Sequence, residues 1–351
     1  MYFDIYTAVG QHLKESTAYM TKTTMFPVKY PLVLLSICLC LAATAVAQTC
    51  STSSDLDAAT NSAIQAAAKQ DFDYAAHGDV FNLKQNAVGS LQSSFSGIEG
   101  VVIDQKAAYA GAQASVQNVY LLDASAASSS GRAEFFCGVW MTPGFASFAI
   151  NNLPAGRYAI VVQNVTGPKG PYMLTLILKQ EQSAWKLAGY YSKPSEIGGH
   201  NAEWYLTKAR EYKNKGQTHD AWFYYLTAWD LMGPVDFMST PKRDKVGDEM
   251  QSARPADVPA DRPTDLVAGG MTWKITRMFP ERGDNGLVLV VKYQSPDVSN
   301  TQKTFDDNMA VIKAVVNKYP EYRDAFSAVV ARAADPNGHE YASLLNMKDV
   351  K

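Results

Sequence analysis

The sequence predicts an α+β protein: helices plus a curved antiparallel sheet, a helix-turn-helix connector, and a small β-β-α-β-β unit. Three observations carry this prediction. Hydrophobic residues recur at helical spacing up to about residue 112, alternate with a period of two over residues 116–193, and return to helical spacing over residues 198–237. Strand and helix patterns then alternate from residue 266 to the end of the sequence.

The composition is that of an ordinary globular protein. The chain has 351 residues, of which 47% are hydrophobic and 19% are charged, with a formal net charge of -2. This length allows two or three domains. A nearly neutral chain without a basic stripe argues against nucleic acid as a partner.

Residues 1–47 are predicted to be a leader, with a signal peptide at 25–47. Lys29 precedes the apolar run PLVLLSICLCLAATAVA, whose final AVA is the small-x-small arrangement that signal peptidase recognises. We therefore expect an exported bacterial protein of the cell envelope, either secreted or periplasmic. Contact with a membrane is expected only through the leader, if that leader stays uncleaved.

The cysteines support an oxidising compartment. Cys38 and Cys40 lie inside the apolar run and leave with it on cleavage. Cys50 and Cys137 remain, and two cysteines in an exported chain predict one disulfide between them. The alternatives are a pair of free, partly buried thiols, or a lipid anchor on Cys50, for which the preceding AQT is a poor match.

Residues 51–193 form the first predicted domain. An alanine-rich helix, ended by Gly78, and shorter helices precede short runs rich in Val, Ile, Tyr, Phe and Trp that are separated by turn residues. This order resembles the cone-shaped fold of the nuclear transport factor two-like superfamily, as does the final hairpin, in which Trp185 follows a tight polar turn. The resemblance implies a curved sheet whose mouth is closed by the helices. The segment NLPAGRY, at 152–158, is instead similar to a turn of carboxypeptidase regulatory-like β-sandwiches.

Residues 198–237 are predicted to form a pair of antiparallel helices. Their pattern resembles one tetratricopeptide repeat, with a glycine near the turn and small or aromatic residues at Ala209, Tyr212, Gly216, Ala221, Tyr225 and Ala228. One repeat cannot bury its own apolar face, and no second copy is present. We therefore expect the pair to pack against its neighbours.

The remaining sequence divides into a linker and a small unit. Residues 238–265 combine charges of both signs with several prolines, which predicts a Pro-rich loop or linker without a packed element. Residues 266–351 show two strands, a helix capped by Thr301, and a second hairpin. They are predicted to form four antiparallel strands with one helix on a face.

Candidate catalytic residues gather where the first helix ends. The cone resemblance implies enzymes similar to ketosteroid isomerases and small polyketide cyclases, which use an Asp, Tyr or His as general acid or base. Asp71, Asp73, Tyr74 and His77 lie on neighbouring helical turns and could face such a mouth. The alternative is a solvated helix end. The scattered histidines and missing nucleotide motifs predict neither a metal site nor a cofactor.

Aromatic residues crowd the helix pair and supply the candidate binding residues. These are Trp204, Tyr212, Trp222, Tyr225 and Trp229. Such residues either pack between the cone domain and the C-terminal unit or line a groove for a peptide or glycan.

The expected function follows from the lack of a catalytic motif and from the aromatic residues of the helix pair. The chain is expected to be a non-enzymatic binding or assembly module of the cell envelope, with an unknown protein partner or a small apolar ligand. The alternatives are a cofactor-free isomerase, cyclase or hydrolase using a pocket in the cone domain, or a carbohydrate-recognition module.

Overall fold

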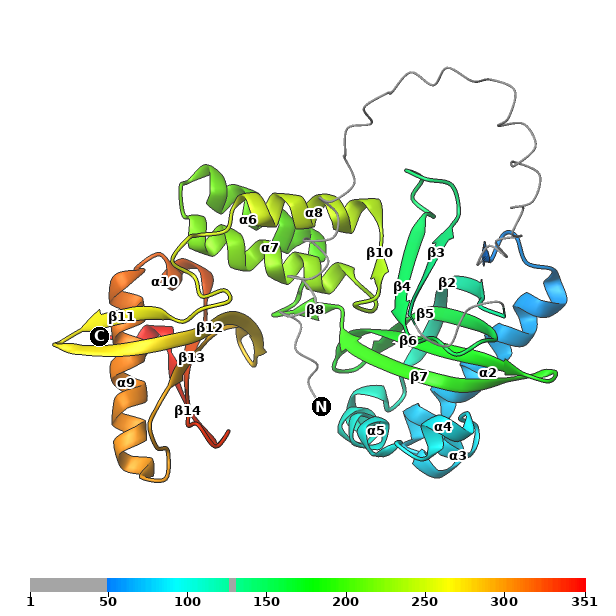
Figure 1. The fold of residues 1–351 in the computed structure, drawn as a ribbon, viewed down its shortest axis with the longest axis horizontal. Helices are drawn as coiled ribbons and strands as arrows, with labels where there is room; N and C mark the ends of the chain where they lie inside the picture. The colour runs from blue at the N-terminus through cyan, green and yellow to red at the C-terminus, as the bar shows by residue number, and fades with distance from the viewer. Residues whose placement is uncertain (1–48, 126–130) are drawn as a thin grey trace, which may run out of the picture.

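The computed structural model describes residues 49–125 and 131–351. Within these ranges the protein is a mixed α+β structure with mostly antiparallel sheets, so the predicted fold class is confirmed. Figure 1 shows an N-terminal unit, residues 49–194, beside a C-terminal unit, residues 202–351. The predicted leader lies outside the described residues.

The N-terminal unit combines helices with two sheets. Its elements are β1 (Thr49–Thr52), α2 (Ala58–His77), α3 (Val80–Gln85), α4 (Gly89–Gln92), α5 (Ser96–Tyr109), β2 (Gln113–Asp123), β3 (Arg132–Cys137), β4 (Ala146–Asn151), β5 (Arg157–Gly167), β6 (Gly170–Glu181) and β7 (Ala184–Pro194). A five-stranded antiparallel sheet has the order β1-β2-β5-β6-β7. The β3–β4 hairpin belongs to a separate three-stranded sheet.

The two faces of the five-stranded sheet carry different layers. Along β5, Ala159 and Val161 pack with the helices, whereas Tyr158 and Ile160 pack with the β3–β4 hairpin. This division follows from the alternation of side chains along a strand, which is also the pattern visible in the sequence. Helices therefore cover one face, and the small sheet covers the other (Figure 1).

Local capping chemistry sets the limits of the first helices. The Asp57 side chain accepts a hydrogen bond from the backbone N–H of Thr60 and caps the start of α2. Gly78 ends the helix with a φ of 67°, a left-handed conformation that glycine adopts at little cost. Asp79 then caps α3.

Two short strands lead into the C-terminal unit. They are β8 (Glu196–Ile197) and β9 (His200–Asn201). The unit itself contains α6 (Ala202–Asn214), α7 (Thr218–Met232), β10 (Met238–Ser239), α8 (Pro241–Ser252), β11 (Thr264–Ala268), β12 (Met271–Gly283), β13 (Gly286–Gln294), α9 (Thr301–Lys318), α10 (Tyr322–Ala325), β14 (Ala328–Ala334), β15 (Glu340–Asn346) and a final 3₁₀ turn, η1 (Met347–Asp349).

The prediction that residues 238–265 form a Pro-rich loop or linker was wrong over much of that segment, because it contains helix α8. The Thr240 side chain caps the helix by accepting from the backbone N–H of Arg243. The Arg243 guanidinium lies 3.7 Å from the ring centre of Trp229, and Val246 is buried in the core. Tertiary packing therefore stabilises a helix whose own composition does not favour one.

The C-terminal sheet also differs from the predicted four antiparallel strands. Its order is β11-β12-β13-β14-β15, and the pairing of β13 with β14 is parallel, as between Val288 and Ala328. Helix α9 is the crossover that brings the chain back in the same direction, as a parallel pair requires. Strand β11 straddles the predicted linker boundary and was not expected.

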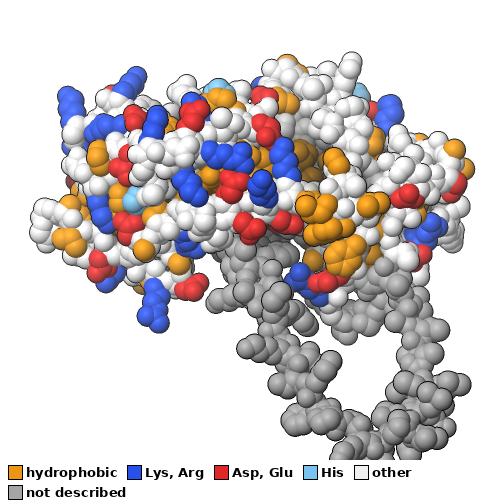
Figure 2. Space-filling model, turned by 90° about the horizontal axis from the view of Figure 1, so that it is seen from above, with side chains coloured by type: hydrophobic (Ala, Val, Ile, Leu, Met, Phe, Trp, Pro, Cys, Tyr) orange, Lys and Arg blue, Asp and Glu red, His pale blue; other side chains and the backbone are white. Residues whose placement is uncertain are grey.

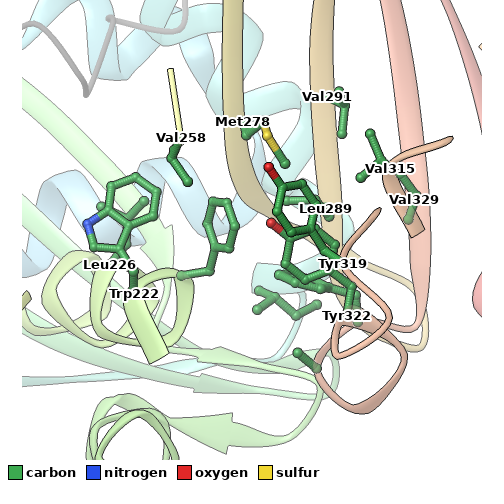
Figure 3. Packing of buried hydrophobic residues seen from close by; sticks show 14 of the residues in the cluster. Trp222, Leu226, Val258, Met278, Leu289, Val291, Val315, Tyr319, Tyr322 and Val329 are labelled. Carbon is green, nitrogen blue, oxygen red and sulfur yellow. The ribbon is translucent and has the colours of Figure 1, made fainter. Parts of the chain in front are cut away.

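The helix pair shares its hydrophobic core with the C-terminal sheet. Figure 3 shows Trp222 and Leu226 of α7 beside Met278 and Leu289 of the sheet and Tyr322 of α10. We expected these aromatic residues to pack between the cone domain and the C-terminal unit. They pack against the C-terminal unit only, since the buried residues of the N-terminal unit form two separate clusters.

A smaller contact joins the two units. Met238 of β10 pairs with Phe148 of β4 and is buried with the hairpin residues. The Lys193 ammonium group donates to the Asp230 backbone carbonyl at 2.5 Å. The C-terminal unit thus supplies the third strand of the sheet that contains the β3–β4 hairpin.

Candidate functional site

The four candidate acid–base residues of α2 point in different directions. Asp71 is buried in the N-terminal unit. Asp73 forms an exposed ion pair with Lys69 at 2.6 Å, and the Nδ1 atom of exposed His77 lies 2.7 Å from the Asp73 backbone carbonyl. Tyr74 is only partly buried. Among the four, Asp71 alone enters the interior.

Asp71 has the properties of a latent acid or base. Its Oδ1 accepts a hydrogen bond from Asn86 at 2.7 Å, and its Oδ2 has no hydrogen-bond partner among the described residues. Burial raises the pKa of Asp71 to about 7, although the Asn86 bond and the Lys186 charge act in the opposite direction. Such a carboxyl can exchange a proton near neutral pH. Its complete burial, however, leaves a substrate no direct access.

Another polar group lies between α5 and β7. The Tyr109 and Ser192 hydroxyls are 2.5 Å apart, and Gln105 donates to the Ser192 backbone carbonyl at 3.4 Å. The buried Tyr190 hydroxyl interacts with that of Tyr109. Burial raises the pKa of Tyr109 to about 12, so this hydroxyl stays protonated at physiological pH. No local sequence pattern indicates this group, because its members lie far apart along the chain.

The candidate binding residues of the helix pair are mostly interior. Tyr212, Trp222 and Tyr225 are buried in the shared core. Trp204 and Trp229 are half-buried and pack against that core. In the described structure these five side chains therefore support the C-terminal unit and do not form an open groove.

An acidic cluster lies where α7 begins, against the turn between α9 and α10. His219 is 2.8 Å from an oxygen of Asp257 and 3.3 Å from one of Glu321. The neighbouring Asp220 is 0% exposed, and neither of its carboxyl oxygens has a hydrogen-bond partner among the described residues. Burial, together with the charges of Glu321 and Asp324, raises the pKa of Asp220 to about 8. Local motif searches miss this cluster because its members come from distant segments.

The most unusual surface feature is the tip of the β3–β4 hairpin, residues 136–145. Phe136, Val139, Trp140 and Met141 have exposed fractions of 62%, 70%, 63% and 70%. Seen from above, hydrophobic side chains gather in a patch on this side of the N-terminal unit (Figure 2). Contiguous exposure of several large apolar side chains is typical of an interaction site.

The hairpin tip is fixed at its base. Cys137, the last residue of β3, forms a disulfide with Cys50 of β1, as the sequence predicted, with 5.0 Å between the two Cα atoms. The Trp140 ring packs edge to face on the buried Phe145 ring, with 4.7 Å between ring centres. The exposed residues are therefore presented on a constrained support.

No family model, curated protein or solved structure matches the chain. None of the helices in the described ranges is long and apolar enough to cross a membrane. Among the same residues, no group of three or more His, Cys, Asp or Glu side chains is arranged to hold a metal ion.

Proposed function

We propose that this protein is an exported, non-enzymatic binding module of the cell envelope, and that the hairpin tip is its binding surface. The observation that carries this proposal is the exposure of Phe136, Val139, Trp140 and Met141 together on one hairpin. Export is inferred from the apolar run before residue 48, and the Cys50–Cys137 disulfide supports an oxidising compartment.

The energetics favour a partner that covers the tip. Full burial of a large apolar side chain stabilises a complex by about 1.5–3 kcal/mol. The disulfide at Cys137 and the packing of Trp140 on Phe145 limit the motion of the tip before binding. Less conformational entropy is therefore lost when the complex forms.

The rest of the chain acts as a support in this proposal. The order of α2–α5 before the sheet is consistent with the resemblance to nuclear transport factor two-like proteins, and the α6–α7 pair with that to a single tetratricopeptide repeat. The aromatic side chains of the pair hold the C-terminal unit together, and its β10 strand extends the sheet of the hairpin.

A second candidate is a cofactor-free acid–base enzyme in the N-terminal unit. The buried Asp71, with a pKa of about 7, favours it. An enzyme of this kind would need the segment around Asn86 to move, so that a substrate could reach Asp71. Carbohydrate recognition has weaker support: the small sheet does stack on the large one, but the residues between them are apolar and buried.

Capture from envelope extract tests the binding proposal. The full chain is used as bait, and the Trp140→Ser/Met141→Ser variant is compared with Phe81→Ser, a change at an equally exposed aromatic on α3. We expect the tip variant to lose the captured components and the control variant to retain them. Equal capture by all three proteins would show that the tip is not the binding surface.

A further inference from the structure

The hairpin tip lies beside the point at which the preceding apolar segment joins the described structure. The apolar run 31–47 ends two residues before β1 begins at Thr49. Cys50 of β1 is bonded to Cys137, and the tip follows directly at Gly138. The disulfide therefore holds the base of the tip next to the first described residues of the chain.

The chemistry of the tip suits a lipid surface. No charged residue occurs from Phe135 to Gly156, so the tip, residues 136–145, carries no ionised side chain that insertion would have to dehydrate. Trp140 is of the type enriched where hydrocarbon meets water. Met141 has a φ of 64°, a conformation that L-residues adopt at a cost, yet its side chain is exposed. An exposed apolar side chain at a strained backbone position does not stabilise the fold, which is consistent with a role in binding.

The surroundings of the tip are polar but carry little charge. A pocket of about 320 Å³ opens between the tip and the segment that follows β1. Most of the side chains that line it carry a hydroxyl or amide group, and Asp55 is the single carboxylate; the polar residues are Thr52, Ser53, Ser54, Asp55, Asn118, Tyr120 and Thr142. The apolar tip with polar residues at its base matches the order of layers in a bilayer, where hydrocarbon gives way to polar headgroups.

We propose that the hairpin tip inserts into the surface of a lipid bilayer. This inference rests on the proposed function and names its partner as lipid. The Cys50–Cys137 disulfide fixes the base of the tip to β1, so insertion of the tip orients the N-terminal unit on the membrane.

Tryptophan quenching by brominated lipid tests the insertion directly. The full chain is reconstituted into neutral phosphatidylcholine vesicles with or without bromine on the acyl chains. Wild-type protein is compared with Trp140→Phe, which keeps an apolar ring, and with Trp185→Phe, which removes a buried tryptophan of the same unit. We expect brominated lipid to quench the wild-type protein and Trp185→Phe, and this quenching to be largely absent in Trp140→Phe.

Partition of the protein between buffer and vesicles measures how much the tip contributes to membrane binding. In the chain lacking the leader 1–47, as an exporting host cleaves it, Trp140→Ser/Met141→Ser is expected to reduce vesicle binding by at least tenfold relative to Phe81→Ser. Quenching that is unchanged by Trp140→Phe would overturn the lipid proposal. If envelope capture still depends on Trp140 and Met141, the partner is a protein and the proposed function stands. If capture is independent of both, the proposed function fails as well.

Discussion

Asp220 gives the sharpest prediction about stability, because its folded environment opposes ionisation. The Asp220→Asn variant keeps the size of the side chain but cannot ionise. The raised pKa means that the folded protein holds the Asp220 proton more tightly than the unfolded chain does. Stability should therefore fall as the pH rises from the unfolded value of 3.8 through the folded value of about 8.

The magnitude follows from the size of the shift. One pKa unit corresponds to about 1.4 kcal/mol, so the change from 3.8 to about 8 sets an upper bound on the order of 6 kcal/mol. Water penetration and relaxation around a buried charge reduce this bound, and we expect about 3 kcal/mol. Above pH 8, Asp220→Asn should be more stable than the wild-type protein by that amount, and near pH 4 the two should be similar.

Urea denaturation between pH 4 and pH 9, followed by tryptophan fluorescence, measures the difference. Four of the six tryptophans lie in the C-terminal unit, so the signal reports mainly on it. Asp248→Asn, on the exposed face of α8, is the matched control and should follow the wild-type profile. Parallel profiles for wild-type protein and Asp220→Asn would refute the reasoning, because the Asp220 proton would then contribute nothing to the pH dependence.

Two further changes test the supports of the fold. Cys137→Ser removes a disulfide that closes 87 residues, and we expect thermal unfolding to show a loss of about 4 kcal/mol in the free energy of unfolding, with Cys50 left as a free thiol. Gly198 has a φ of 58°, and an added Cβ would lie 2.9 Å from the Gly286 Cα. Gly198→Ala should therefore cost about 2 kcal/mol or more, against about 1 kcal/mol for Gly199→Ala, which has a positive φ but open space. Equal losses for the two glycine variants would contradict the close approach.

Much of the fold is encoded in local patterns. The apolar run over β5 predicted a strand, and Gly78 and Gly216 mark the helix end and the turn that were expected at these glycines, both with positive φ. These features depend on residues that are close together in the sequence, so the sequence alone predicts them. The disulfide followed from the cysteine count together with the predicted export.

The structure differs from the sequence-based prediction where contacts between distant residues determine the local structure. Helix α8 is stabilised by Arg243 stacked on Trp229, a contact that composition does not reveal, although Thr240 before Pro241 was a visible capping signal. The parallel pairing of β13 with β14 depends on the crossover made by α9. The burial of Asp220 depends on the turn after α9, about a hundred residues away.

The candidate site was the least predictable part. The hairpin tip and the core strands have the same apolar composition, and the sequence does not say which of them faces solvent. Two signals were nevertheless present: the uncharged stretch 135–156, and the cysteine at its start. Cys137 connects that stretch to β1, and so to the apolar run that precedes it.

The central claim is that the hairpin tip is the surface by which this protein binds. Photo-crosslinking from position 140 tests it most directly, with a photoreactive phenylalanine analogue in place of Trp140 and, in a matched protein, in place of the equally exposed Phe81. In intact envelopes we predict that crosslinks to lipid or to an envelope component form from position 140 and not from position 81. Efficient crosslinking from position 81, with none from position 140, would contradict the account.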